Sequence, residues 1–461
     1  MPLPPHFIGQ LHAIVGADHV RTDEPSRQTY GIDGTKRGHP ADVVVMPDGA
    51  RDVAAIVGLC AEHRVPMVPR GAGTGYTGGA VPLHGGVVVS MERMHRILEI
   101  DEENLVAIVE PNVITGDLQA AVERVGLFYP PDPASLQRSA IGGNVAECAG
   151  GPRAFKYGTT KQYVLGLEAV LPTGEIVETG GKVVKNVVGY DLTHLLVGSE
   201  GTLAIITKIV LRLVPKPPVQ STLRATFRDV AAAAGAVTEI IRERVVPAAV
   251  ELIDRDSLEA VARYLGVRSL APEDTGALLL LEVDGLAEAV AEEAVRVERA
   301  CRRAGATELL RARGETERQE LWRVRRELSP ALKTIAPLKF NHDVVVPKGR
   351  IPQLFALIAR IKADCGVRIP CFGHAGDGNI HVNIMVNDAD DEIRRAQEAE
   401  RALFEGVVAL EGSITGEHGI GYVKSKFLAI ELSADEIALM ERVKRAFDPH
   451  GILNPGKIFP R

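Results

Sequence analysis

The chain has 461 residues and a formal net charge of −7, from 53 basic and 60 acidic side chains. At about 150 residues per domain this length predicts two or three domains, and 46% hydrophobic with 25% charged residues is typical of a globular protein. The slight acidic excess gives no reason to expect nucleic acid or an anionic membrane as a partner.

The sequence contains no run of about 18 apolar residues, so we expect no transmembrane helix. The first residues, Met1–Gln10, hold three prolines and no apolar core, which is not the pattern of a signal peptide. The cysteines are Cys60, Cys148, Cys301, Cys365 and Cys371. None forms a Cys-x-x-Cys pair, which argues against an iron–sulfur cluster or a zinc knuckle and favours buried, unpaired thiols. We therefore expect a reducing, cytoplasmic compartment.

The first half alternates short β-type runs with amphipathic helical patterns. The predicted strands are Ala41–Met46, Val65–Pro69, Gly86–Ser90, Leu105–Glu110 and Leu203–Val214. A helical pattern covers Arg51–His63, with Asp52 as the predicted N-cap. A second pattern covers Gly116–Val125, and the helix is predicted to begin at Asp117. This mixture predicts an α+β domain of two subdomains.

Three prolines in Val214–Val219 (VPKPPV) predict a domain boundary. Beyond it, helical patterns at Val230–Arg244 and Leu286–Ala304 flank a strand at Ala277–Val283, which indicates a ferredoxin-like domain. A last helix is expected at Asp435–Phe447. The predicted domains are thus residues 1–215, residues 220–410, and a short helical C-terminal segment, residues 411–461, that packs back on the first domain.

The loop Arg70–Gly79 (RGAGTGYTGG) matches G-x-G-x-x-G at Gly73, Gly75 and Gly78. A Rossmann loop must open directly into a helix, but here the residues that follow, GAVPLHGG, disfavour a helix start. Consecutive glycines can still gather backbone N–H groups into a nest for an anion such as phosphate. A tight surface turn is the alternative, but so many glycines would cost stability without a function.

Two further glycine-rich regions lie in the same domain, at Pro130–Gly158 and Gly198–Leu203. One such loop would be weak evidence. Three together favour a cofactor held between two subdomains.

These segments, RGAGTGYTGG, PDP…IGGN…AGG…KYG and GSEGTL, resemble the FAD-binding domain of the vanillyl-alcohol oxidase-type flavoproteins. The resemblance implies non-covalent FAD, because covalent members carry a histidine in the first loop and this loop has none. It places the pyrophosphate at Arg70, Gly71, Ala72, Gly73, Thr74, Gly75, Thr77, Gly78 and Gly79. It places the flavin and ribityl chain near Pro131, Ser139, Gly142, Gly143 and Asn144, and the adenine end near Ile205. Further cofactor contacts are expected from Asp132, Ala149, Gly150, Gly151, Tyr157, Gly158, Glu200, Gly201 and Asn454.

A second constellation lies in the C-terminal half. His374 and His381 stand seven apart in GHAGDGNIHVN, and GEHGIG supplies Glu417 and His418. Two histidines and a carboxylate form a three-ligand metal set that leaves a position open for substrate. Each residue alone has an ordinary structural interpretation, but their joint placement between glycines favours a site, with His418 as either a ligand or a base.

The motifs HAGDGNIH and GEHGIG, with the ending Asn454–Lys457, resemble the C-terminal half of the D-2-hydroxy-acid dehydrogenases. That group includes D-lactate and D-2-hydroxyglutarate dehydrogenases and the catalytic subunit of glycolate oxidase. The resemblance implies that His374, His381 and Glu417 hold a divalent metal, often zinc, and that His418 is the base. Arg325, in a Trp-x-x-Arg pattern, would bind the substrate carboxylate, although a solvated helix charge is its alternative.

Hydroxyglutarate enzymes carry Lys-Tyr-Asp where this chain has Asn341-His342-Asp343, which favours a monocarboxylic substrate such as lactate or glycolate. The expected reaction is FAD-dependent oxidation of a small D-2-hydroxy acid, with hydride transfer to flavin N5. Electrons would leave to a separate acceptor: a quinone, a cytochrome, a flavoprotein or an iron–sulfur subunit. The sequence leaves open a homodimer. It also leaves two rivals: a non-redox transferase of the alkylglycerone-phosphate synthase type, and a metal hydrolase, which would leave the glycine loops unexplained.

Overall fold

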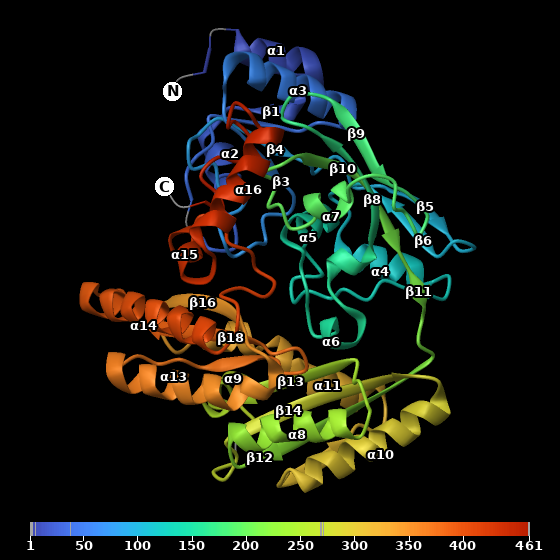
Figure 1. Ribbon diagram of the computed structural model, residues 1–461, viewed down its shortest axis with the longest axis vertical. Coiled ribbons are helices and arrows are strands. Elements are labelled where there is room, and N and C mark those ends of the chain that lie inside the picture. The colour runs from blue at the N-terminus through green and yellow to red at the C-terminus, as the bar shows by residue number, and fades with distance from the viewer. Residues whose placement is uncertain (1–2, 5, 37, 268–269, 271, 460–461) are drawn as a thin grey trace. The chain divides into compact units, whose positions relative to one another are not determined.

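The computed structural model describes residues 3–4, 6–36, 38–267, 270 and 272–459 (Figure 1). Part of the N-terminal segment Met1–Gln10 therefore lies outside the described residues. The chain divides into two compact units. The first comprises Met1–Gly150, Thr159–Lys216 and Glu417–Arg461, and the second comprises Gly151–Gly158 and Pro217–Gly416.

The first unit contains a four-stranded sheet in the order β1-β2-β4-β3, in which β2, β4 and β3 run parallel and β1 antiparallel. The strands are β1 (Val20–Arg21), β2 (Val43–Val45), β3 (Met67–Arg70) and β4 (Val87–Ser90). Helices α1 (Phe7–Val15) and α3 (Ala50–His63) supply apolar side chains to the core on this sheet. A short helix, α2 (Glu24–Thr29), precedes β2.

A second, antiparallel sheet of the same unit has the order β5-β6-β10-β8-β9. Its strands are β5 (Ile97–Asp101), β6 (Val106–Val109), β8 (Val164–Val170), β9 (Ile176–Gly180) and β10 (Ile205–Arg212). A small ribbon pairs β7 (Leu127–Phe128) with β11 (Val214–Pro215). The remaining helices of this unit are α4 (Thr115–Glu123), α5 (Ile141–Glu147), α7 (Leu192–Leu196), α15 (Leu428–Glu431) and α16 (Ala434–Phe447). Two sheets with their helices confirm the predicted α+β class.

Two predicted helix starts were wrong. Helix α3 begins at Ala50 with Gly49 as its N-cap. Asp52 therefore lies inside the first turn, and its carboxylate accepts the N–H of Asp48 at 3.0 Å instead of capping the helix. Helix α4 begins at Thr115, ahead of the predicted Asp117, because extended backbone at Ile114 already ends the preceding segment.

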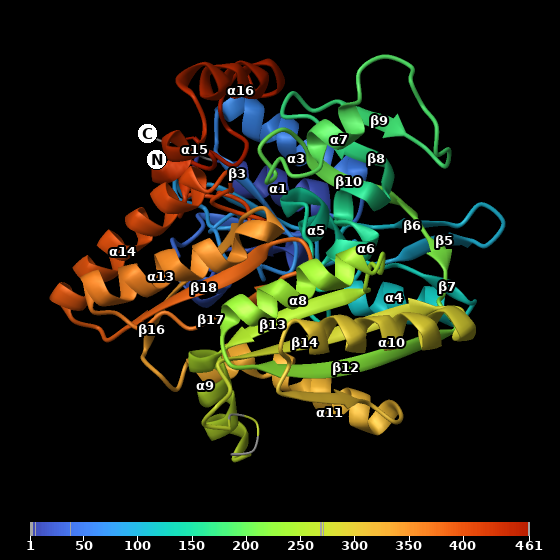
Figure 2. The same cartoon turned by 60° about the horizontal axis from the view of Figure 1, so that its bottom comes forward.

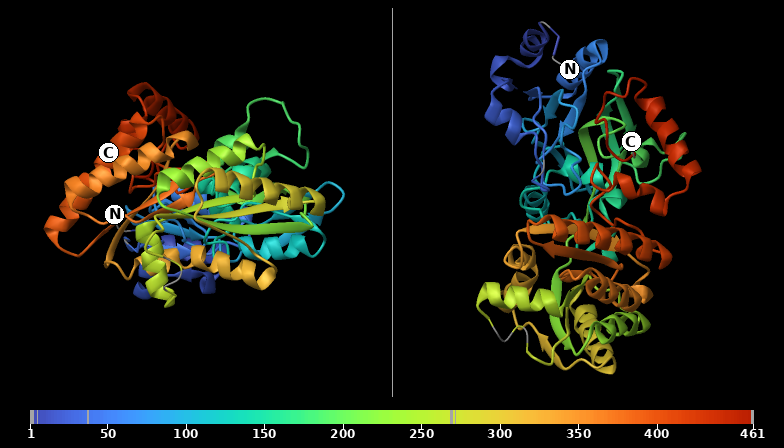
Figure 3. Two further views of the ribbon diagram at one scale, coloured as in Figure 1. Left: turned by 90° about the horizontal axis from the view of Figure 1, so that it is seen from below. Right: turned by 90° about the vertical axis from the view of Figure 1, so that its left-hand side faces the viewer.

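The second unit is built on one seven-stranded antiparallel sheet, in the order β15-β12-β14-β13-β17-β18-β16. The strands are β12 (Val219–Phe227), β13 (Ala249–Asp254), β14 (Ala277–Gly285), β15 (Glu308–Arg311), β16 (Leu338–Val345), β17 (Cys371–His374) and β18 (Asn379–Val386). Its helices are α6 (Ala154–Tyr157), α8 (Val230–Arg242), α9 (Arg255–Leu265), α10 (Ala287–Arg303), α11 (Glu315–Arg326), α12 (Leu328–Leu332), α13 (Ile351–Cys365) and α14 (Asp390–Ala409). Helices α8, α10, α13 and α14 cover one face of the sheet, and α9 and α11 lie on the other (Figures 2 and 3).

This sheet consists of two ferredoxin-like halves. The strands β12, β13, β14 and β15 are ordered 4-1-3-2 by their place in the chain, with α8 and α10 as the connecting helices, which is the predicted ferredoxin-like pattern. A second, shorter half follows with β16, α13, β17, β18 and α14. The halves join where β13 pairs with β17, through Glu251↔His374, Leu252↔Gly373 and Ile253↔Phe372. We call these three register pairs the seam.

None of the helices in the described part of the chain combines the length and the apolar composition needed to cross a membrane.

Candidate functional site

The glycine-rich loop connects β3 to β4 without an intervening helix, as the sequence predicted. Its first residue, Arg70, donates from Nη1 to the Ile32 carbonyl at 2.6 Å, and burial lowers the pKa of this guanidinium. On the other side, the Tyr422 N–H donates to the Thr77 carbonyl at 3.0 Å. At Gly78, φ is +78°, and a Cβ there would lie 1.9 Å from the Tyr422 ring. The loop therefore needs glycine at this position, because Tyr422 closes over it.

We expect Gly78→Ala to lower both the FAD content and the stability of the protein. A left-handed backbone costs a non-glycine residue roughly 1–2 kcal/mol, and the new methyl group must also displace the Tyr422 ring. The FAD-to-protein absorbance ratio and the thermal unfolding midpoint measure the two effects. The control is Gly58→Ala in α3, where a Cβ would meet nothing within 4 Å. Equal behaviour of the two variants would contradict a special role for Gly78.

Glu200 and Asn454, both predicted cofactor contacts, tie the glycine loop to the segment that follows His418. The buried Glu200 carboxylate accepts the N–H groups of Ile420 at 2.8 Å and Gly421 at 2.6 Å. Burial raises the pKa of this carboxyl, although the two N–H donors oppose that shift. Asn454 donates from Nδ2 to the carbonyls of Gly79 and Glu200 at 2.9 and 2.8 Å. Its Oδ1 is buried and accepts no hydrogen bond from the residues that the structure describes, so it remains open to an outside donor.

The second glycine-rich region is partly helical, since Gly142, Gly143 and Asn144 open α5. Asn144 donates to the Thr115 hydroxyl at 2.7 Å, and that hydroxyl lies 3.0 Å from the hydroxyl of Ser139. A Cβ on Gly142 would lie 2.6 Å from Pro111, so the helix packs directly on neighbouring backbone.

The other predicted cofactor residues occupy several environments. The Pro131 carbonyl accepts from Gln119 at 2.9 Å, and Ile205 is buried in the core of the first sheet. Gly151, Tyr157 and Gly158 belong to the second unit. There the Tyr157 hydroxyl and the Lys156 ammonium both donate to the Asp284 carboxylate, at 2.7 and 2.5 Å. This anchor could not be predicted from local sequence patterns, because Tyr157 and Asp284 are 127 positions apart.

His374 and His381 lie on the hairpin formed by β17 and β18, both buried. Their ring centroids are 5.3 Å apart, with the ring planes at 82°. Gly378, in the turn between them, has φ +90°, and a Cβ there would lie 1.9 Å from the Val346 carbonyl oxygen. The turn residues thus bring the two imidazoles together, which is the convergence that the sequence pattern predicted.

Glu251 is a residue that sequence reasoning missed. Its side chain is fully buried on β13, where it accepts a hydrogen bond from His374 Nδ1 at 2.5 Å and pairs with Arg325 Nε. Burial alone would raise the pKa of its carboxyl, but Arg325 and His374 together lower it to about 2. The available signal was an acid between apolar residues in the middle of a strand (AVELID), since a buried charge requires a partner.

Arg325 lies on α11 and is buried, so it is not a solvated helix charge. Its guanidinium carbon lies 4.8 Å from the centre of the Phe372 ring, a cation–π distance. Nε pairs with Glu251, whereas Nη1 and Nη2 make no hydrogen bond to any residue that the structure describes. Two parallel donors therefore remain for an anion such as a carboxylate.

Asp343 fixes the chain that leads to Glu417. It is fully buried on β16, and its carboxylate accepts the Gly416 N–H at 2.8 Å and the Thr415 hydroxyl at 3.2 Å. Glu417 follows Gly416 directly in the chain and is the first residue of the C-terminal part of the first unit. One ligand atom from each of His374, His381 and Glu417 lies within 4.8 Å of the others. Two imidazole nitrogens and a carboxylate oxygen suit a zinc-like ion.

His418 lies in the first unit beside the glycine loop. The Thr77 hydroxyl donates to its carbonyl at 3.3 Å, and its ring centroid is 5.5 Å from that of Tyr76. The predicted base and the predicted pyrophosphate loop are therefore neighbours within one unit.

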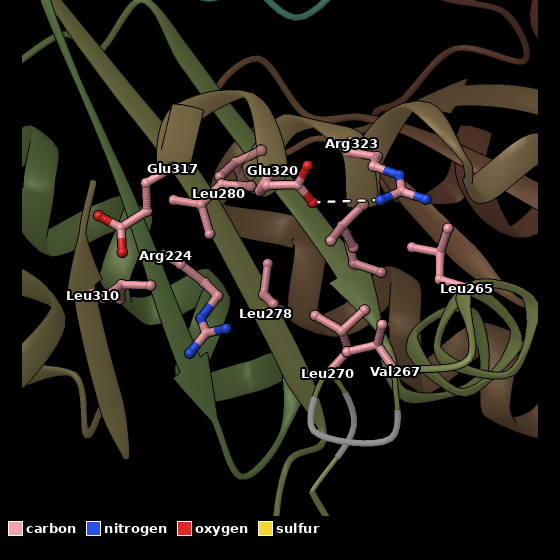
Figure 4. Close-up of a pocket in the computed structure, with 13 residues that line it drawn as sticks. Arg224, Leu265, Val267, Leu270, Leu278, Leu280, Leu310, Glu317, Glu320 and Arg323 are labelled. Atoms are coloured by element: carbon pink, nitrogen blue, oxygen red, sulfur yellow. Dashed lines mark hydrogen bonds and ion pairs between the residues drawn. The ribbon is translucent and has the colours of Figure 1, made fainter. Parts of the chain in front are cut away.

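A cavity of about 230 Å³ lies in the second unit among α9, α11 and the sheet (Figure 4). Apolar side chains such as Leu265, Leu278, Leu280 and Leu310 make most of its wall, with the charged groups of Arg224 and Glu317 at one side. None of the predicted catalytic or metal residues is among the described residues that line it. The cavity therefore does not mark the chemical site.

Comparison with known proteins identifies the class. Residues 216–458 match the family of FAD linked oxidases, C-terminal domain, and residues 41–180 match the FAD binding domain. The chain therefore belongs to the FAD-linked oxidase family and is an FAD-linked oxidoreductase, which excludes the hydrolase alternative.

Several similar curated proteins are named as oxidases or dehydrogenases of hydroxy acids. The chain is 42% identical to glycolate oxidase subunit GlcD of Bacillus subtilis over 98% of its length and 96% of that protein. It is 37% identical to D-lactate dehydrogenase of Anaerostipes hadrus, covering 90% of this chain and 89% of that protein. It is 36% identical to D-2-hydroxyglutarate dehydrogenase of Stutzerimonas stutzeri, covering 99% of each.

Solved structures share the fold. p-Cresol methylhydroxylase aligns with a TM-score of 0.83 at 18% identity, over 98% of this chain and 96% of that one. 4-Ethylphenol oxidase from Gulosibacter chungangensis aligns with a TM-score of 0.80 at 22% identity, over 99% and 97%. Alkyldihydroxyacetonephosphate synthase aligns with a TM-score of 0.76 at 21% identity, over 98% and 86%. At sequence identities this low, the similarity shows a shared fold alone. The match to alkyldihydroxyacetonephosphate synthase therefore does not support the transferase alternative.

Proposed function

We propose that this enzyme oxidises a small D-2-hydroxy acid, with D-lactate or glycolate favoured, to the corresponding 2-oxo acid. The observation that carries the proposal is the buried cluster in which Glu251 contacts both Arg325, the proposed carboxylate-binding residue, and His374, a proposed metal ligand. A 2-hydroxy acid presents a carboxylate and a hydroxyl on adjacent carbons, and so offers one group to each. The names of the similar proteins point to the same substrate class.

In this mechanism Arg325 holds the substrate carboxylate through its two terminal nitrogens. His374, His381 and Glu417 would hold a divalent metal, which supplies a Lewis acid that lowers the pKa of the substrate hydroxyl. His418 accepts the hydroxyl proton. FAD, held non-covalently, supplies the two-electron acceptor N5 for the C2 hydride.

The glycine loop suits the FAD pyrophosphate, because closely spaced glycines can gather backbone N–H groups into an anion-binding nest. The other predicted residues of the first unit would follow the cofactor from there. Electrons would pass to a separate acceptor, and the word subunit in the names of the GlcD relatives supports a partner chain in that role.

Anaerobic titration of the yellow protein with D-lactate, L-lactate, glycolate, D-malate and D-2-hydroxyglutarate tests the proposal. We expect D-lactate or glycolate to bleach the visible flavin band at the lowest concentrations, and the dicarboxylates to do so poorly, because Asn341 stands where the hydroxyglutarate enzymes have lysine. An unchanged flavin spectrum with every acid would refute the function. Preference for a dicarboxylate would refute only the substrate assignment.

A further inference from the structure

Glu251 stands directly opposite His374 at the seam, and one carboxylate serves two partners that come from different parts of the second unit. Its Oε1 accepts from His374 Nδ1 at 2.5 Å, and its Oε2 pairs with Arg325 Nε. Arg325 reaches it from α11, across a separation of 74 residues, and His374 from β17, across 123. All three side chains are more than nine-tenths buried.

The carboxylate fixes which nitrogen of His374 carries the proton. An ionised carboxylate only accepts hydrogen bonds, so Nδ1 must be the donor. In the neutral imidazole, Nε2 then keeps its lone pair, which is the form that binds a metal ion. Carboxylates in this position orient metal-binding histidines and raise their basicity.

The same carboxylate also aims the arginine. With Nε occupied by Glu251 and the guanidinium stacked on Phe372 at 4.8 Å, the planar group is held in one orientation. Its Nη1 and Nη2 edge is then the edge presented to a ligand.

We propose that Glu251 is a positioning residue that sets, through one buried carboxylate, both the metal-binding tautomer of His374 and the orientation of the Arg325 fork. The role rests on the proposed function, because it assumes a metal at His374 and a carboxylate substrate at Arg325. This role couples metal binding to the binding of the substrate carboxylate. Loss of Glu251 should therefore weaken both together.

The decisive variant is Glu251→Gln in the full-length holoenzyme. The amide keeps the size of the side chain but has one acceptor and one donor. If the amide oxygen accepts from Arg325, the NH₂ group faces His374 and favours the tautomer with the proton on Nε2. If the oxygen accepts from His374 instead, the NH₂ group faces the Arg325 Nε–H, and two donors oppose each other. We expect Zn²⁺ affinity, measured by competition with a chromophoric chelator, to fall by roughly 10- to 100-fold. We also expect a higher KM for the hydroxy acid at saturating Zn²⁺.

The matched control is Glu282→Gln. Glu282 is also a buried acid on the same sheet, and it contacts the same helix, α11, by accepting from Trp322 Nε1 at 2.8 Å. Its hydrogen-bond partners are Thr222, Arg318 and Trp322, so it bonds to neither His374 nor Arg325. A purely structural effect of removing a buried charge beside α11 should appear in both variants, whereas the positioning effect should appear only in Glu251→Gln.

A second variant, Glu251→Asp, keeps the charge but is one methylene shorter, so it cannot span both partners. We expect this variant to bind Zn²⁺ more tightly than Glu251→Gln but less tightly than the wild type. It also serves as the test variant if Glu251→Gln does not accumulate as folded flavoprotein. Zn²⁺ affinity and KM that match those of the wild type in Glu251→Gln, or that fall equally in Glu282→Gln, would overturn the positioning role. Wild-type protein that binds no Zn²⁺ or is reduced by no hydroxy acid would instead overturn the proposed function.

Discussion

Replacement of His418 by asparagine is expected to slow substrate-dependent flavin reduction by roughly 10²- to 10⁴-fold, the range that general-base catalysis contributes. Asparagine cannot take up the hydroxyl proton, although it preserves the backbone of the GEHGIG segment. That backbone is held independently of the side chain, through the Thr77 hydroxyl at 3.3 Å and through Glu200. FAD should therefore stay bound, and stopped-flow absorbance of the flavin band under anaerobic conditions measures the rate.

The matched control for this variant is His194→Asn. His194 is in the same unit, and its ring nitrogens bond to Asp191 at 2.6 Å and to the Lys161 carbonyl at 3.1 Å, neither of which is a predicted site residue. The flavin of His194→Asn should be reduced by the substrate at the wild-type rate. Wild-type reduction rates in His418→Asn would show that another group accepts the proton, whereas loss of FAD from it would show a structural role instead.

Removal of the proposed metal is expected to have the second large effect. Lewis-acid assistance is worth several kcal/mol in metalloenzymes, and about 4 kcal/mol corresponds to a roughly 10³-fold lower rate of flavin reduction. We expect protein treated with a strong chelator to stay yellow, to lose this reactivity with hydroxy acids, and to recover it when Zn²⁺ or another divalent ion is added.

The variant His381→Ala ties the effect to the proposed ligands. It removes one nitrogen of the cluster that brings three ligand atoms within 4.8 Å, so added Zn²⁺ should no longer restore the rate. Elemental analysis of each sample gives its metal content. Full activity in protein shown to be metal-free would contradict the metal's role, and restoration of His381→Ala by Zn²⁺ would contradict this ligand assignment.

Local patterns in the sequence predicted much of the fold. The proline cluster, the strand at Ala277–Val283 and the two long helices beyond the boundary indicated a ferredoxin-like domain, and β14, α8 and α10 form it. The residues after Gly79 argued against a Rossmann helix, and β3 does lead through a loop to β4. The exact helix starts were not predictable in the same way, because Asp52 has an alternative partner in the Asp48 N–H.

Long-range pairs limited the prediction of the site. The histidines were visible because their turn residues lie between them in the chain. Glu251 was not, because its partners are 74 and 123 positions away and no local pattern connects them. The same limit applies to Asp343, whose carboxylate holds Gly416 from 73 positions away.

The seam has a dynamic consequence. Three register pairs align the two ferredoxin-like halves there, and one of them is Glu251↔His374. Partial opening of a protein often separates such sub-structures before the whole chain unfolds. A brief separation of the halves would release His374 from the Glu251 carboxylate while leaving each half folded. The dissociation rate of a bound ion would then report how often the halves separate.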